Sequence, residues 1–144
     1  MPRKTVKINP DQASALVLAY IGDAVYEILV RRHLINKGTT KVKDLHREAV
    51  KFVNAGTQAR VVHALEDKLT DTEIKVLKRG RNAKSGTSPK NVSMIDYRYG
   101  TALEALFGYL YLKGEDSRLA EIFELVKSIV NESAEEYGDE SKTD

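Results

Sequence analysis

Apolar residues recur at the three- and four-residue spacing of a helix along almost the whole chain. In the first such segment they include Leu16, Tyr20, Ala24 and Ile28. This spacing places apolar side chains on one face of a helix, where neighbouring helices can bury them. No segment sustains the alternation of apolar and polar residues that is typical of strands. We therefore expect an all-α fold, and 144 residues are enough for one domain with its own core.

Capping and helix-breaking residues divide the chain into six predicted helices. Asn9-Pro10 is expected to begin the first helix and Lys37-Gly38 to end it, because Asn caps helices and Gly ends them. Thr40 is expected to cap the second helix. The other predicted helices run from about Thr57 to Leu69, from Thr70-Asp71 through Leu77, from about Met94 to Leu112, and from Asp116-Ser117 through Ile129. Residues 82–93 contain a cluster of Gly, Ser and Pro and are expected to form a loop.

Two apolar segments far apart in the chain each contain a single carboxylate, Asp23 in one and Glu104 in the other. An ionised carboxylate on an apolar helix is costly unless a positive group lies nearby. Small residues flank both acids, including Gly22 and Gly108, so the two helices can approach closely. If they pack together, both carboxylates can bind one hard cation such as Mg²⁺, which prefers oxygen ligands. The alternative is that each acid pairs with a base such as Arg98 or Arg32.

No other group of residues indicates a catalytic or metal site. The three histidines share no ligand spacing, and Ser85 and Ser88 have no matching His/Asp motif. Glu27 lies one turn after Asp23 and is expected to extend into solvent. Cysteine is absent, which excludes disulfides and thiolate metal sites.

Positive charge is concentrated between Lys75 and Lys90, where no acidic residue occurs. Such a run either contacts a phosphate backbone or forms an ordinary solvated surface. The candidates for such contacts with a nucleic acid are Lys78, Arg79, Arg81, Asn82, Lys84, Ser85 and Lys90. Residues 132–144 instead contain six acidic residues and one basic residue, Lys142, and we expect a disordered tail there after a folded domain in residues 1–131.

The N-terminus and the apolar segments bear on location. No apolar run follows Pro2-Arg3-Lys4, so nothing resembles a secretory signal. No apolar stretch has the length needed to cross a bilayer. We therefore expect a cytoplasmic protein that does not contact a membrane.

The two acidic segments resemble the motifs of the ribonuclease III family. Residues 18–25, LAYIGDAV, are similar to its signature helix, L-E-F-L-G-D-A/S-x. Residues 101–108, TALEALFG, are similar to its second acidic motif, D-x-F-E-A-L-x-G. Residues 78–91 and Tyr97-Arg98-Tyr99 closely resemble the basic loop and following segment of its mini-ribonuclease III branch, which consists of the catalytic domain alone.

This resemblance implies a helical endoribonuclease that acts as a homodimer and cleaves double-stranded RNA. Asp23 and Glu104 fall on the essential acids, which bind the Mg²⁺ cofactor, with Mn²⁺ as an alternative cation. Tyr20 falls on the aromatic residue that inserts into the partner subunit. The resemblance also implies a role in maturing the 23S ribosomal RNA precursor, assisted by a protein of the large ribosomal subunit.

The chain departs from the family pattern at two positions. Typical members carry further carboxylates where this chain has Ala19 and Thr101, so the number of metal ions per site stays open. The missing acids also leave an alternative function, a catalytically inactive module that binds structured RNA or ribosomal assemblies. A helical dimerisation protein without an RNA role is a third hypothesis.

Overall fold

Helices make up the whole described fold. The computed structural model describes residues 8–83 and 92–142. Its helices are α1 (Ala15–Asn36), α2 (Val42–Val53), α3 (Ala55–Leu65), the 3₁₀ turn η1 (Glu66–Lys68), α4 (Asp71–Asn82), α5 (Met94–Leu112) and α6 (Asp116–Lys142). No strand occurs in these two ranges, which confirms the all-α prediction. Within them, no helix is long and apolar enough to span a membrane.

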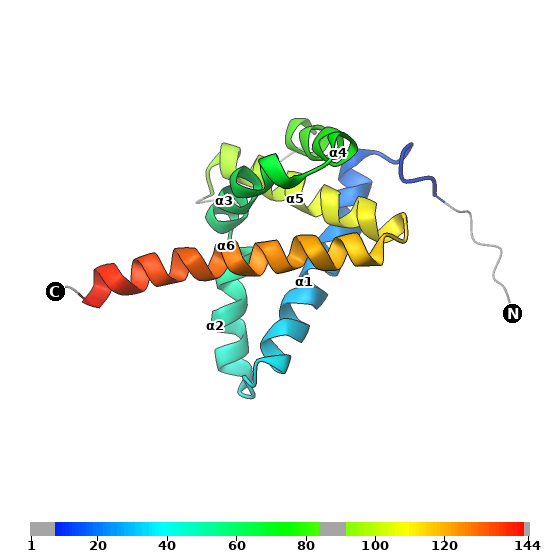
Figure 1. Cartoon of the computed structure of the whole chain (residues 1–144). Coiled ribbons are helices and arrows are strands. Elements are labelled where there is room, and N and C mark those ends of the chain that lie inside the picture. Colours follow the sequence, from blue (N-terminus) through cyan, green and yellow to red (C-terminus); the bar gives the residue numbers. More distant parts are fainter. Residues whose placement is uncertain (1–7, 84–91, 143–144) are drawn as a thin grey trace, which may run out of the picture.

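Helix α5 is the centre of the fold because it is apolar on nearly every side. Its residues from Gly100 to Leu110 are all buried except Glu104, which is half-buried. A helix that is apolar all round must be covered on all sides, and α1, α3, α4 and α6 each pack against α5. Figure 1 shows α6 crossing this group, while α1 and α2 form a V that projects from it.

Glycines allow α1 and α5 to pack backbone against backbone. A Cβ atom added at Gly22 would lie 1.6 Å from the carbonyl oxygen of Glu104, and one added at Gly108 would lie 1.9 Å from that of Leu18. Neither position has room for a side chain. The prediction of a close approach at these small residues is confirmed, and this contact sets how Asp23 and Glu104 face each other.

The predicted helix starts are partly wrong. Asn9 begins only a single turn, in which its side chain accepts a hydrogen bond from the Asp11 amide, and α1 begins later with Ser14 as its cap. The residue before α2 is Lys41 rather than Thr40, and α3 is capped by Asn54. The residues before all three helices have extended backbones, but only Ser14 and Asn54 accept a capping hydrogen bond, and Lys41 accepts none.

The predicted cap of α4 is confirmed. Thr70 and Glu73 form a reciprocal capping box, each side chain bonded to the other's backbone amide. The predicted start of α5 at Met94 and its end at Leu112 are also confirmed. Helix α6 continues to Lys142, so it includes most of the segment from residue 132 onward. The division of the chain into a domain and a tail stays a prediction.

Candidate active site

Asp23 and Glu104 meet at one pocket between α1 and α5. The pocket has a volume of about 620 Å³, and Ala19, Tyr20, Glu27, Tyr97 and Thr101 also line it. The Asp23 carboxyl group is close enough to Glu104 to raise the pKa of the Glu104 carboxyl group. The two residues are 81 positions apart in sequence numbering (23 against 104), and the packing of Gly22 against Glu104 brings them together.

The environment of Glu104 disfavours its charged form. Burial is the largest cause, followed by the neighbouring carboxyl group of Asp23 and the charge of Glu27, and together they raise the pKa of Glu104 to about 8. Asp23 itself is exposed at the mouth of the pocket. One acid thus reaches solvent, and the other is held against the floor of the site.

No base balances this pair among the described side chains. Neither Asp23 nor Glu104 forms an ion pair within residues 8–83 and 92–132, and the pocket lining contains no Lys, Arg or His. The alternative that Arg98 or Arg32 neutralises an acid is therefore not supported in that part of the chain. A raised carboxyl pKa beside a second carboxylate is the pattern that a bound cation would relieve.

The donor chemistry of the pocket fits a hard divalent cation. Asp23 and Glu104 supply carboxylate oxygens, and Mg²⁺ is commonly held by one or two carboxylates together with water and phosphate oxygens. The described residues contain no cluster of three acidic, His or Cys side chains close enough to enclose an ion. Two direct protein ligands would leave most of the coordination sphere to water and substrate.

Glu27 and Tyr97 belong to the pocket, which the sequence interpretation missed. Glu27 is half-buried and lines the site instead of extending fully into solvent. Its spacing of one helical turn from Asp23 was the available signal. Thr101 also lines the pocket, and its hydroxyl donates a hydrogen bond to the Tyr97 carbonyl oxygen at 3.2 Å.

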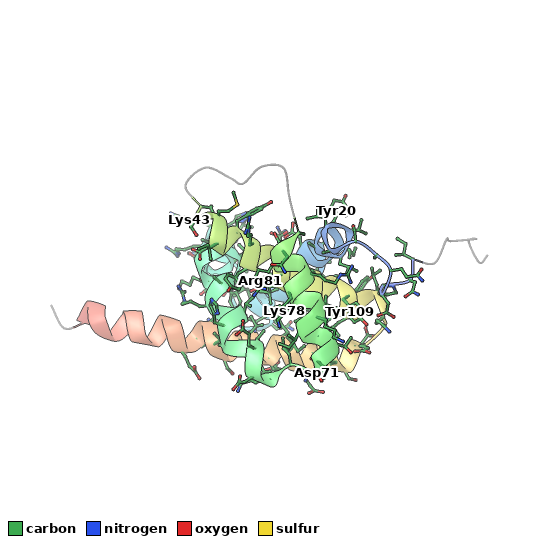
Figure 2. All side chains as sticks on the ribbon, turned by 90° about the horizontal axis from the view of Figure 1, so that it is seen from above. Tyr20, Lys43, Asp71, Lys78, Arg81 and Tyr109 are labelled. Atoms are coloured by element: carbon green, nitrogen blue, oxygen red, sulfur yellow. The ribbon has the colours of Figure 1, made fainter. Side chains whose placement is uncertain are left out.

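Tyr20 lies at the edge of the pocket on the outer face of α1. Its side chain is 85 % exposed, and Leu16, Val17 and Ile28 on the same helix are exposed as well. The helix thus presents large apolar groups to solvent beside the acidic pair. Figure 2 shows Tyr20 on α1 next to α4, the helix that carries Lys78 and Arg81.

The end of α4 is held close to the pocket. A Cβ atom at Gly80 would lie 2.7 Å from the Cα atom of Ala102 and 3.1 Å from the Thr101 carbonyl oxygen. Arg81 is the next residue in the chain, so its backbone is held beside this contact. Lys78 and Asn82 are exposed and Arg81 is half-buried. The Arg81 Nε atom donates to the Asn82 side chain at 3.2 Å.

Arg79 has a structural partner that the sequence did not indicate. Its guanidinium donates a hydrogen bond of 2.6 Å to the carbonyl oxygen of Ala13, which ties α4 to the turn before α1. The other predicted contacts with RNA, Lys84, Ser85 and Lys90, lie outside the described residues. The predicted RNA contacts that the structure describes therefore all lie in the last two turns of α4.

Comparisons with known proteins identify the family of this chain. Residues 16–115 match the model of the ribonuclease III domain. The chain is 48% identical over 130 residues to a protein of Brevibacillus brevis named Mini-ribonuclease 3, covering 90% of this chain and 97% of the relative. It is 49% identical over 129 residues to a Clostridium tetani protein of the same name, covering 89% of this chain and 85% of the relative.

A solved structure shares the arrangement of helices. The crystal structure of protein FN1578 from Fusobacterium nucleatum superposes with a TM-score of 0.76 at 27% sequence identity. The match covers 83% of this chain and 98% of that one. The matched family region includes both Asp23 and Glu104, and so the whole candidate site.

Proposed function

The chain belongs to the ribonuclease III family and is a ribonuclease, and from this premise we propose that it hydrolyses double-stranded RNA at the pocket of Asp23 and Glu104 with Mg²⁺. The observation that carries the proposal is the meeting of two carboxyl groups in a pocket whose lining contains no base. A cation bound there would supply the missing positive charge. The phosphate of an RNA backbone would complete its coordination.

The roles of the side chains follow from their positions. Mg²⁺, when bound, activates a water molecule and offsets negative charge that develops on the phosphate. Glu104, half-buried on the floor of the pocket, and Asp23, exposed at its mouth, would hold the ion between the protein and the scissile phosphate. Hydrolysis in this arrangement needs no covalent nucleophile from the protein and leaves a 5′ phosphate and a 3′ hydroxyl.

Basic residues beside the pocket would hold the RNA strand. A-form RNA offers phosphates, 2′-hydroxyls and shape, because its deep major groove hides the base edges. Lys78 and Arg81 are suited to phosphates and Asn82 to 2′-hydroxyls, and we extend this role to Lys84, Ser85 and Lys90. Arg79 would also contact a phosphate, through the guanidinium N–H groups that do not donate to Ala13.

A homodimer is the proposed working form. The large apolar side chains exposed along α1, with Tyr20 at their centre, offer a surface that a second copy could cover. Tyr20→Ala should then shift the protein from dimer to monomer in light scattering, whereas Tyr111→Ala, which is also an exposed aromatic change, should shift it less. A monomeric wild-type protein would contradict the assignment.

The physiological substrate is proposed from the family alone. We infer the 23S ribosomal RNA precursor as substrate, with a protein of the large ribosomal subunit as assisting partner. Ala19 and Thr101, where acids are expected, favour one second candidate, an inactive module that binds structured RNA.

A cleavage assay separates the enzyme from the inactive module. Double-stranded RNA is incubated with wild-type protein, with Asp23→Asn and with the matched surface variant Asp67→Asn, each in Mg²⁺ or in chelator. We expect cleavage only with Mg²⁺, a reduction of at least a hundredfold in Asp23→Asn, and wild-type activity in Asp67→Asn. Binding of RNA without cleavage by the wild-type protein would instead support the module.

A further inference from the structure

Glu27 is a third carboxylate beside the acidic pair. It lies one helical turn after Asp23 on α1 and lines the same pocket as Asp23 and Glu104. It also borders an apolar groove between α1 and α2, so its side chain stands at the boundary of the two hollows. Its charge is near enough to act on the Glu104 carboxyl group.

Arg31 holds Glu27 without cancelling it. The Arg31 Nη2 atom lies 3.7 Å from Glu27 Oε2, and the two side chains are 66% and 44% exposed. An ion pair at that distance with this exposure is weak, because water screens it. The contact therefore leaves the negative charge of Glu27, one turn after Asp23, available to the pocket.

We propose that Glu27 is a positioning residue of the cation site, accepting hydrogen bonds from water molecules bound to the ion that Asp23 and Glu104 hold. This inference rests on the proposed function. The described acids form no cluster of three that could ligate one ion directly, so Glu27 acts through water. Mg²⁺ usually keeps several of its waters, and these need acceptors. Glu27 would then replace part of the negative charge that Ala19 and Thr101 do not supply.

Cation titration of the full chain tests this role. The midpoint for Mg²⁺ is measured twice, from cleavage and from the cation-induced rise in melting temperature, which does not depend on activity. We expect Glu27→Gln to raise both midpoints about tenfold, as is usual when a residue that supports a metal's ligands is removed. The KM for RNA at saturating Mg²⁺ should stay within twofold of the wild-type value.

Arg31→Gln is the matched control. It breaks the same ion pair and leaves the Glu27 charge in place, so its Mg²⁺ midpoints should stay at or below the wild-type values. Equal midpoints in Glu27→Gln and wild type would overturn the inference, as would an equal rise in Arg31→Gln. Asp23→Asn identifies the broader failure: if it cleaves RNA and responds to Mg²⁺ like the wild type, the proposed function itself is wrong.

Discussion

Gly22 and Glu104 touch through their backbones, since a methyl group on Gly22 would lie 1.6 Å from the Glu104 carbonyl oxygen. The oxygen belongs to the main chain of a buried helix and cannot move aside without shifting α5. The same contact joins the helix that carries Asp23 to the helix that carries Glu104. Stability and site geometry therefore depend on one glycine.

Gly22→Ala should destabilise the protein and damage the site together. Overpacking against an immobile backbone costs on the order of 3 kcal/mol, which corresponds to a fall of about 10 °C in melting temperature. Gly56→Ala is the control, because a Cβ atom there meets nothing nearer than 3.5 Å, and alanine in a helix should stabilise by about 0.5 kcal/mol. A Gly22→Ala protein as stable as the wild type would contradict the close contact.

Binding of Mg²⁺ should strengthen as pH rises towards 8. The pKa of Glu104 is raised to about 8, so below that pH a cation must displace a proton to bind. We expect the Mg²⁺ midpoint in a thermal-shift titration to fall by nearly tenfold per pH unit from pH 6 to 7.5 and to level off above pH 8. In Glu104→Gln the slope should vanish, and an unchanged slope in that variant would assign the proton to another group.

Arg81→Ala combined with Lys84→Ala should weaken RNA binding more than stability. For every phosphate that the variant no longer neutralises, the negative slope of log affinity against log salt should become shallower by about 1. The paired control is Lys51→Ala with Lys68→Ala, which removes the same charge from exposed positions on α2 and η1. Filter binding over a salt series measures the RNA affinity and the salt slope of both double variants. Equal cleavage by the first pair and the wild type at low RNA concentration would exclude these residues as RNA contacts.

Glu73 should stabilise the fold at neutral pH but not in acid. It is buried and accepts hydrogen bonds of 2.9 and 2.8 Å from Arg118 Nε and Nη2. These bonds are the largest cause of its lowered pKa. A carboxyl group with a lowered pKa stabilises the folded state above its unfolded pKa, and that stability is lost as pH falls through the folded value.

Urea unfolding of Glu73→Gln measures this effect. At pH 7 the variant should lose on the order of 3 kcal/mol, because the Arg118 guanidinium is left without its carboxylate. The difference from wild type should shrink steadily below about pH 4. Glu121→Gln, which removes the exposed partner of Arg118, should change stability by less than about 1 kcal/mol at either pH.

Sequence alone predicted the elements that depend on local patterns. The apolar run from Met94 to Leu112 predicted a long helix, and Thr70-Asp71 predicted the start of α4. Asn9 and Thr40 misled the prediction of helix starts, because the residues that directly precede α1 and α2 are Ser14 and Lys41. Where each helix begins depends on how the chain turns between packed helices.

Asp23 and Glu104 could be chosen from the sequence because an acid within an apolar helix is conspicuous wherever the helix lies. Glu27 and Arg79 could not be interpreted in this way. Glu27 looks like any solvated acid until α5 covers one side of α1, and Arg79 looks like one more base of a positive run until Ala13 is folded against it.

The order of amino acids determined by itself that this chain is helical, where its most apolar helix lies and which acids need a counter-charge, because those properties follow from spacing within a few turns. Tertiary structure decided that the acids share one pocket, that Glu27 joins them and that Arg79 turns towards the N-terminal turn. These contacts arise between helices distant in sequence, and their geometry depends on how closely the backbones can approach at Gly22, Gly80 and Gly108.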